Sequence, residues 1–160
     1  MCYFSNALES PQVTVDTICH TMGDPKFGRI DQVVGTGVSG IIALLPVSMQ
    51  SGIPCMIIRK PREIDECVTQ GGCHSDRLVE NVSKVDAGRY VIIDDSIDSG
   101  RTIRRIIETM IGEYPHSECV GIILYQENSY YESPNAMFAD VPITRIAGDI
   151  DCLQEHRIMV

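Results

Sequence analysis

The sequence lacks the features that mark membrane-spanning, secreted and nucleic-acid-binding proteins. No window approaches the roughly 18 consecutive apolar residues that a membrane-spanning helix requires. Residues 1–6 contain no basic region followed by a long apolar stretch, so we expect no secretory signal. Lysine and arginine number 13 against 22 aspartates and glutamates, a formal net charge of −9. This deficit of positive charge argues against a nucleic-acid backbone as partner, but backbone N–H groups and a metal ion can still hold a small phosphorylated ligand.

The seven cysteines are scattered, and none of them forms a C-x-x-C pair. Their odd number argues against a disulfide framework, and their spacing gives no support to a structural zinc site. Cys67, Cys73 and His74 are close enough in sequence to suggest a metal cluster, but we favour a polar loop that happens to carry thiols. Free thiols fit a reducing compartment, so we expect the protein in the cytoplasm.

The alternation of apolar runs and amphipathic stretches predicts a single domain spanning residues 1–160, since no internal repeat interrupts it. The expected strands are 30–34, 54–59, 90–94 and 120–125, and the expected helices are 12–22, 41–49 and 102–111. Gly23 and Gly112 are expected to end the first and third helices. Strand–turn–helix units in series predict an α/β fold, with a mostly parallel twisted sheet flanked by helices.

Two segments depart from this alternation. The polar stretch from about residue 61 to 86 has no sustained hydrophobic period, and loops of this length are usually functional or mobile, so we expect a mobile loop. Residues from about 126 to 160 are expected to form an irregular tail, with candidate short strands at 144–146 and 157–159. Ligands of parallel sheets bind at the carboxyl ends of the strands, where the glycine-rich turn 35–40 and the loop after Asp95 are both expected.

The stretch 91–102 carries the most information about chemistry. Its apolar strand delivers Asp94 and Asp95 to an open end, and adjacent strand residues point to opposite faces, so at least one carboxylate must face the cleft. The Ser-Gly-x-Thr turn at 99–102 then opens a helix whose free N–H groups and two hydroxyls suit a phosphate. Gly100 allows the backbone to approach the anion closely. With carboxylates beside it for sugar hydroxyls, the pattern matches a ribose 5-phosphate.

This stretch resembles the signature of type I phosphoribosyltransferases, which bind 5-phosphoribosyl 1-pyrophosphate (PRPP) and move its sugar onto a nitrogenous base. The signature is an apolar strand, two acidic residues and a Thr/Ser-Gly-x-Thr/Ser loop, whereas a Walker A pattern is excluded because no Gly-Lys-Ser/Thr occurs. The resemblance implies that Asp94 and Asp95 contact the ribose 2′- and 3′-hydroxyls. It also implies that five residues surround the 5′-phosphate: Asp98, Ser99, Gly100, Arg101 and Thr102.

Other segments resemble further parts of the same family. The glycine-rich turn stands where the family binds pyrophosphate, which implies contacts from Thr36 and Gly37. Lys60 resembles a basic residue that the family places near the pyrophosphate. The loop from about residue 61 to 86 falls where the family has its mobile catalytic lid, and the tail falls where it has a small C-terminal hood.

The resemblance implies an Mg²⁺-dependent transfer to a nucleobase that releases pyrophosphate. Asp94 and Asp95 are then catalytic and contact the metal, either directly or through PRPP or water. Asp98 stands where hypoxanthine-guanine phosphoribosyltransferases carry a candidate general acid/base, which favours a 6-oxopurine. The alternative is that Asp98 only caps the following helix.

One departure leaves the base open. The oxopurine enzymes place a lysine at the end of the following strand, whereas Tyr125 and Gln126 stand there and are weak candidates for base contacts. Orotate or another pyrimidine is therefore an alternative acceptor. A non-catalytic regulator that senses PRPP or a nucleotide, or a silent binding module, is an alternative function on the same fold. Because the family often pairs, a homodimer is a further expectation.

Overall fold

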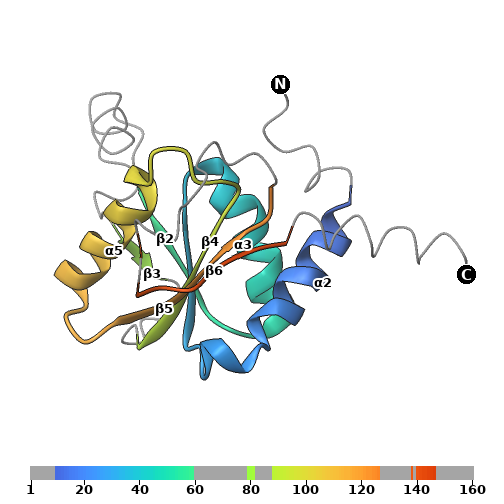
Figure 1. The fold of residues 1–160 in the computed structure, drawn as a ribbon, viewed down its shortest axis with the longest axis horizontal. Coiled ribbons are helices and arrows are strands. Elements are labelled where there is room, and N and C mark those ends of the chain that lie inside the picture. The colour runs from blue at the N-terminus through green and yellow to red at the C-terminus, as the bar shows by residue number, and fades with distance from the viewer. Residues whose placement is uncertain (1–9, 60–78, 82–87, 127–137, 139, 147–160) are drawn as a thin grey trace, which may run out of the picture.

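The computed structural model describes residues 10–59, 79–81, 88–126, 138 and 140–146. A six-stranded sheet runs through its middle in the order β3-β2-β1-β4-β5-β6 (Figure 1). The strands are β1 Gln32–Thr36, β2 Cys55–Ile58, β3 Val79–Asn81, β4 Arg89–Asp94, β5 Glu118–Leu124 and β6 Ile143–Arg145. Only the β2–β3 pair is antiparallel within this sheet. The predicted α/β fold with a mostly parallel sheet is confirmed.

Helices cover both faces of the sheet (Figure 1). Helices α2 (Pro11–Met22) and α3 (Gly37–Ser51) pack on one face, and α5 (Arg101–Glu113) packs on the other; a short 3₁₀ turn, η1 (Pro25–Phe27), precedes β1. Each face has its own apolar core. The core under α5 includes Ile103, Ile106 and Met110, which recur at helical spacing along one face of α5. No helix in the described residues is long and apolar enough to cross a bilayer.

The order of the strands places a topological switch point between β1 and β4. From β1 the chain passes through α3 to β2 on one side of the sheet, whereas from β4 it passes through α5 to β5 on the other side. The two connections therefore leave the carboxyl ends of β1 and β4 in opposite directions. Crevices of this kind are where doubly wound sheets bind their ligands.

Most element boundaries agree with the sequence, and two predictions are wrong. Helix α2 begins at Pro11, one residue before the predicted start, and its C-cap is Gly23, as predicted. The predicted loop at 35–40 does not form, because β1 continues through Thr36 and α3 begins at Gly37. Gly112 does not end α5 either, since the helix continues through Glu113.

The predicted loop and tail are described only in part. Val79–Asn81, inside the expected loop, pairs with β2 as strand β3. Ile143–Arg145, inside the expected tail, extends the sheet as β6, close to the candidate strand at 144–146. Several predictions fall outside the described residues: Lys60, the Cys67, Cys73 and His74 group, the strand at 157–159, and the mobility and hood expected of these segments.

Candidate functional site

Two adjacent carboxylates stand at the end of β4 and are oriented by the backbone around them. Asp94 is 4% exposed, and its Oδ1 accepts hydrogen bonds from the Asp95 N–H at 3.0 Å and from the Ser39 hydroxyl at 3.4 Å. Asp95 is half-buried, and its Oδ1 accepts a hydrogen bond from the Ser96 N–H at 2.9 Å. Both carboxylates are therefore held in place by the chain itself before any ligand binds.

Burial dominates the electrostatics of Asp94. Desolvation raises the pKa of Asp94 to about 8 from its ordinary value of 3.8, and the neighbouring Asp95 carboxylate adds to this rise. Hydrogen bonds from the Asp95 N–H and the Ser39 hydroxyl oppose the rise by a smaller amount. A buried carboxylate that faces a second one is costly as an anion, so this position favours a bound cation or a hydrogen-bond donor.

The raised pKa of Asp94 predicts a pH-dependent cost to folding. The unfolded chain releases this proton near pH 3.8 and the folded protein near pH 8, so the folded state binds more protons in between, and stability falls as the pH rises through this window. Asp94→Asn cannot ionise and is expected to gain stability relative to wild type as the pH rises from about 4 to about 8. Urea unfolding of both proteins at several pH values measures this gain; a pH-independent difference would contradict the shifted pKa.

The chain enters α5 through a glycine in the left-handed region. Gly100 is buried, has a φ of 69°, and is the N-cap of α5 with no side chain capping the helix. The first backbone N–H groups of a helix have no acceptor within the helix, and the positive end of the helix dipole lies beside them. The start of α5 is therefore a favourable position for an anion.

A cavity of about 400 Å³ joins the acidic pair to the start of α5. Its lining residues are Thr36, Ser39, Asp94, Asp95, Ser96, Ile97, Asp98, Ser99, Gly100, Thr102 and Ile103. Most of these carry carboxylate or hydroxyl oxygens, and the cavity lies at the switch point between β1 and β4. Its shape and chemistry suit a polar ligand with both hydroxyl and phosphate groups.

Glycines bring α3 close to the sheet beside this cavity. Gly37 has a φ of 64° and begins α3 immediately after β1. Gly35 and Gly40 face each other: a Cβ on Gly40 would lie 3.4 Å from the Gly35 Cα and 3.4 Å from the Ile93 carbonyl oxygen. These two glycines therefore serve close packing between helix and strand.

The structure gathers most of the predicted site residues around one cavity. Seven of them line it: Thr36, Asp94, Asp95, Asp98, Ser99, Gly100 and Thr102. The Thr36 hydroxyl also donates to the Ile58 carbonyl oxygen at 2.5 Å, which ties β1 to β2. Gly37 and the exposed Arg101 are not among the lining residues.

Tyr125 and Gln126, the candidates for base contacts, are buried beside the acidic pair. Tyr125 is 1% exposed, and its hydroxyl donates to the Ser39 carbonyl oxygen at 2.6 Å. The Gln126 N–H donates to the Asp95 carbonyl oxygen at 2.9 Å. Burial, together with the two carboxylates, raises the pKa of Tyr125, so its hydroxyl stays a donor. The ring itself packs in the apolar core.

Four lining residues were missed from the sequence: Ser39, Ser96, Ile97 and Ile103. Ser39 lies in the glycine-rich segment that was expected at this edge of the sheet, so its position was the available signal. Ser96 and Ile97 lie between the acidic pair and Gly100, and only the path of the loop shows that they face the cavity.

The oxygen atoms that line the cavity suit a hard cation such as Mg²⁺, bound together with a ligand. Mg²⁺ prefers oxygen ligands and is usually bound by one or two carboxylates together with substrate phosphates and water. The cavity offers the oriented carboxylates of Asp94 and Asp95 and the hydroxyl of Ser39. Among the described residues no three His, Cys, Asp or Glu side chains form a metal-binding group, so a protein-only cage is not indicated there.

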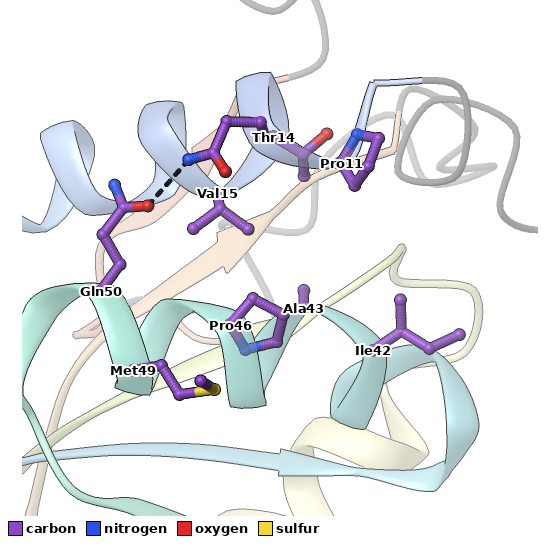
Figure 2. Close-up of a pocket in the computed structure, with 9 residues that line it drawn as sticks. Pro11, Thr14, Val15, Ile42, Ala43, Pro46, Met49 and Gln50 are labelled. Atoms are coloured by element: carbon purple, nitrogen blue, oxygen red, sulfur yellow. Dashed lines mark hydrogen bonds between the residues drawn. The ribbon is translucent and has the colours of Figure 1, made fainter.

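A second, apolar groove lies between α2 and α3 (Figure 2). Val15 of α2 lies across it from Ala43 and Pro46 of α3, and the 86% exposed Met49 also lines it. A 2.9 Å hydrogen bond between the side chains of Gln12 and Gln50 bridges one end. It shares no lining residue with the oxygen-lined cavity. Its apolar character makes it unsuitable for a phosphorylated ligand.

The fold and the cavity define a class: doubly wound α/β domains with a polar site at the switch point. The chain belongs to the phosphoribosyl transferase domain family, whose model matches residues 24–149. It is 35% identical over 120 residues to an adenine phosphoribosyltransferase of Mannheimia succiniciproducens, covering 70% of this chain and 65% of the relative. It is 25% identical over 120 residues to a hypoxanthine/guanine phosphoribosyltransferase of Methanospirillum hungatei, covering 72% and 65%. The chain thus spans slightly less than two thirds of the length of these relatives.

Solved structures show the same fold at low sequence identity. An orotate phosphoribosyltransferase from Aeropyrum pernix matches with a TM-score of 0.64 and 16% identity, covering 89% of this chain and 74% of that chain. An adenine phosphoribosyltransferase from Thermoanaerobacter pseudethanolicus matches with a TM-score of 0.63 and 16% identity, covering 86% and 79%. The family resemblance inferred from residues 91–102 is confirmed.

Proposed function

We propose that this protein transfers the phosphoribosyl group of PRPP to a purine base in an Mg²⁺-dependent reaction that releases pyrophosphate. One observation carries the proposal: the carboxylates of Asp94 and Asp95 line the same cavity as Gly100, the N-cap of α5. Membership of the phosphoribosyl transferase family supports the type of reaction.

PRPP binds with its two ends on different elements. The N–H groups at the start of α5 and the hydroxyls of Ser99 and Thr102 hold the 5′-phosphate, supported by their position around Gly100. The start of α3 at Gly37 lies beside the cavity and holds the pyrophosphate. Asp94 and Asp95 hold the ribose hydroxyls and the metal, directly or through water.

The chemistry needs little from the protein beyond position and charge. Positive charge builds up on the sugar ring as the bond from C1 to the pyrophosphate breaks, and the carboxylates of Asp94 and Asp95 stabilise that charge. When bound, Mg²⁺ neutralises charge on the leaving pyrophosphate. The buried surroundings of Asp94 strengthen its interaction with a cationic centre, because little water competes.

Asp98 is our candidate for proton transfer at the base. Its side chain is exposed at the lining of the cavity, and the N-cap position that it was alternatively expected to fill is occupied by Gly100. A carboxylate that is free of a capping bond and open to the cavity can exchange a proton with a purine ring nitrogen. This position of Asp98 makes 6-oxopurines our first candidates for the acceptor base. Adenine must be tested as well, because the relatives include an adenine phosphoribosyltransferase and a hypoxanthine/guanine phosphoribosyltransferase.

We expect Asp98→Asn to lower turnover with hypoxanthine or guanine by about a hundredfold, with a smaller effect on PRPP affinity. The melting temperature should stay near that of wild type, because the side chain does not cap α5. Glu113→Gln, which removes an exposed carboxylate at the other end of the same helix, is the matched control. Unchanged turnover together with a lower melting temperature would assign Asp98 a purely structural role.

Pyrophosphate release from PRPP tests the proposed function. The reaction is run with adenine, hypoxanthine, guanine and orotate in turn, with and without Mg²⁺. We expect release that needs both a purine and Mg²⁺. Pyrophosphate release with orotate but with none of the purines would show that the acceptor is a pyrimidine. Tight PRPP binding without pyrophosphate release for any base would indicate a sensor instead of an enzyme.

A further inference from the structure

Tyr125 connects the two halves of the candidate site. It follows β5 directly and lies next to β4 in the sheet, because its backbone N–H donates to the Asp94 carbonyl oxygen at 3.2 Å. Its hydroxyl donates to the Ser39 carbonyl oxygen, in the first turn of α3, at 2.6 Å. One residue thus holds the strand that carries the acidic pair and the helix that begins at the switch point.

Ser39 continues this connection to the acidic pair. Its hydroxyl lies 3.4 Å from the Asp94 Oδ1, a long hydrogen bond that depends on where the first turn of α3 sits. Two residues of this turn, Gly37 and Gly40, have no side chain that could anchor it, and Gly40 packs against another glycine, Gly35 of β1. The short bond from Tyr125 therefore supplies a fixed point that the glycines do not.

The burial of Tyr125 makes this bond hard to replace by water. The ring is 1% exposed and packs in the core between the sheet and α3. Loss of the hydroxyl would remove this short bond to the half-buried Ser39 carbonyl oxygen, and water would have to enter beside the buried ring to replace it. Without this bond, the first turn of α3 is freer to move relative to Asp94.

We propose that Tyr125 is a positioning residue that sets the distance between the first turn of α3 and the carboxylate pair, and so prepares the cavity for a ligand that contacts both. In the proposed function, on which this inference rests, the ligand is PRPP, with its pyrophosphate at α3 and its ribose at Asp94 and Asp95. The hydroxyl touches neither the substrate nor the metal and acts through Ser39.

The variant Tyr125→Phe removes the hydroxyl and keeps the buried ring. Tyr90→Phe is its matched control: Tyr90 is also 1% exposed, but it lies near the start of β4, and its hydroxyl interacts with the Cys119 thiol. Both variants lose one buried hydroxyl, so a general loss of stability affects them alike. Only Tyr125→Phe disturbs the spacing between α3 and Asp94.

The test combines two measurements on wild type and both variants. Calorimetry with PRPP and Mg²⁺ is expected to show an affinity about tenfold weaker in Tyr125→Phe and nearly unchanged in Tyr90→Phe. Without ligand, amide hydrogen exchange in the first turn of α3 is expected to be faster in Tyr125→Phe only. Wild-type protein that does not bind PRPP would overturn the proposed function, and the exchange measurement would then decide the positioning role alone. Equal behaviour of the two variants in exchange and affinity would overturn the inference.

Discussion

Replacing both Asp94 and Asp95 with asparagine is expected to lower turnover by about a thousandfold or more and to weaken the binding of PRPP with Mg²⁺. The two carboxylates line the cavity and are already oriented by the Asp95 and Ser96 N–H groups. Asparagine preserves the shape of both side chains but removes the charges that stabilise the metal and the cationic sugar ring. Steady-state kinetics with the best base, together with calorimetry, measure both effects.

The same double variant should remain folded. Asp94 is costly as a buried anion, so its replacement removes a penalty at neutral pH. Glu118→Gln removes an exposed carboxylate at the opposite edge of the sheet, together with its 2.8 Å ion pair to Arg89, and is the control for loss of a surface charge away from the cavity. Wild-type kinetics in the double variant would end the enzyme proposal in its present form.

Gly100→Val is expected to weaken PRPP binding by more than about a hundredfold, the second large effect. Gly100 is buried in the lining of the cavity at the start of α5, and a side chain there would stand between the helix N–H groups and a phosphate. The φ of 69° adds strain that a β-branched residue tolerates poorly. Calorimetry with PRPP measures the loss of affinity, and urea unfolding measures the strain.

Gly52→Val separates strain from obstruction. Gly52 ends α3 with a φ of 71°, almost the same conformation, and a Cβ built there meets nothing within 4 Å. We expect both valine variants to lose comparable stability, but only Gly100→Val to lose affinity for PRPP. Unchanged PRPP affinity in a folded Gly100→Val protein would show that the phosphate does not bind at the start of α5.

The part of the site that the sequence predicted best depends on local order along the chain. Asp94, Asp95 and Gly100 follow one buried strand and open one helix, so their proximity comes from a few consecutive residues. Apolar periodicity was equally sufficient for α2, whose start at Pro11 and end at Gly23 are set by residues within the helix or next to it.

The predictions that failed depend on contacts between distant segments. β1 continues through Gly35 and Thr36 because these residues pair with Ile57 and Ile58 of β2, although glycine disfavours strands. Tyr125 was expected at the end of the strand 120–125, but the bond from its hydroxyl to the Ser39 carbonyl oxygen joins residues far apart in sequence. Local residue preferences contain no information about either contact.

A crystal structure of the protein with PRPP and Mg²⁺ tests the central claim most directly. Our account predicts the 5′-phosphate at the start of α5 around Gly100, the ribose hydroxyls beside Asp94 and Asp95, and the pyrophosphate at the first turn of α3. PRPP bound elsewhere, such as in the apolar groove between α2 and α3, or a ligand-saturated crystal with an empty switch-point cavity, would contradict it.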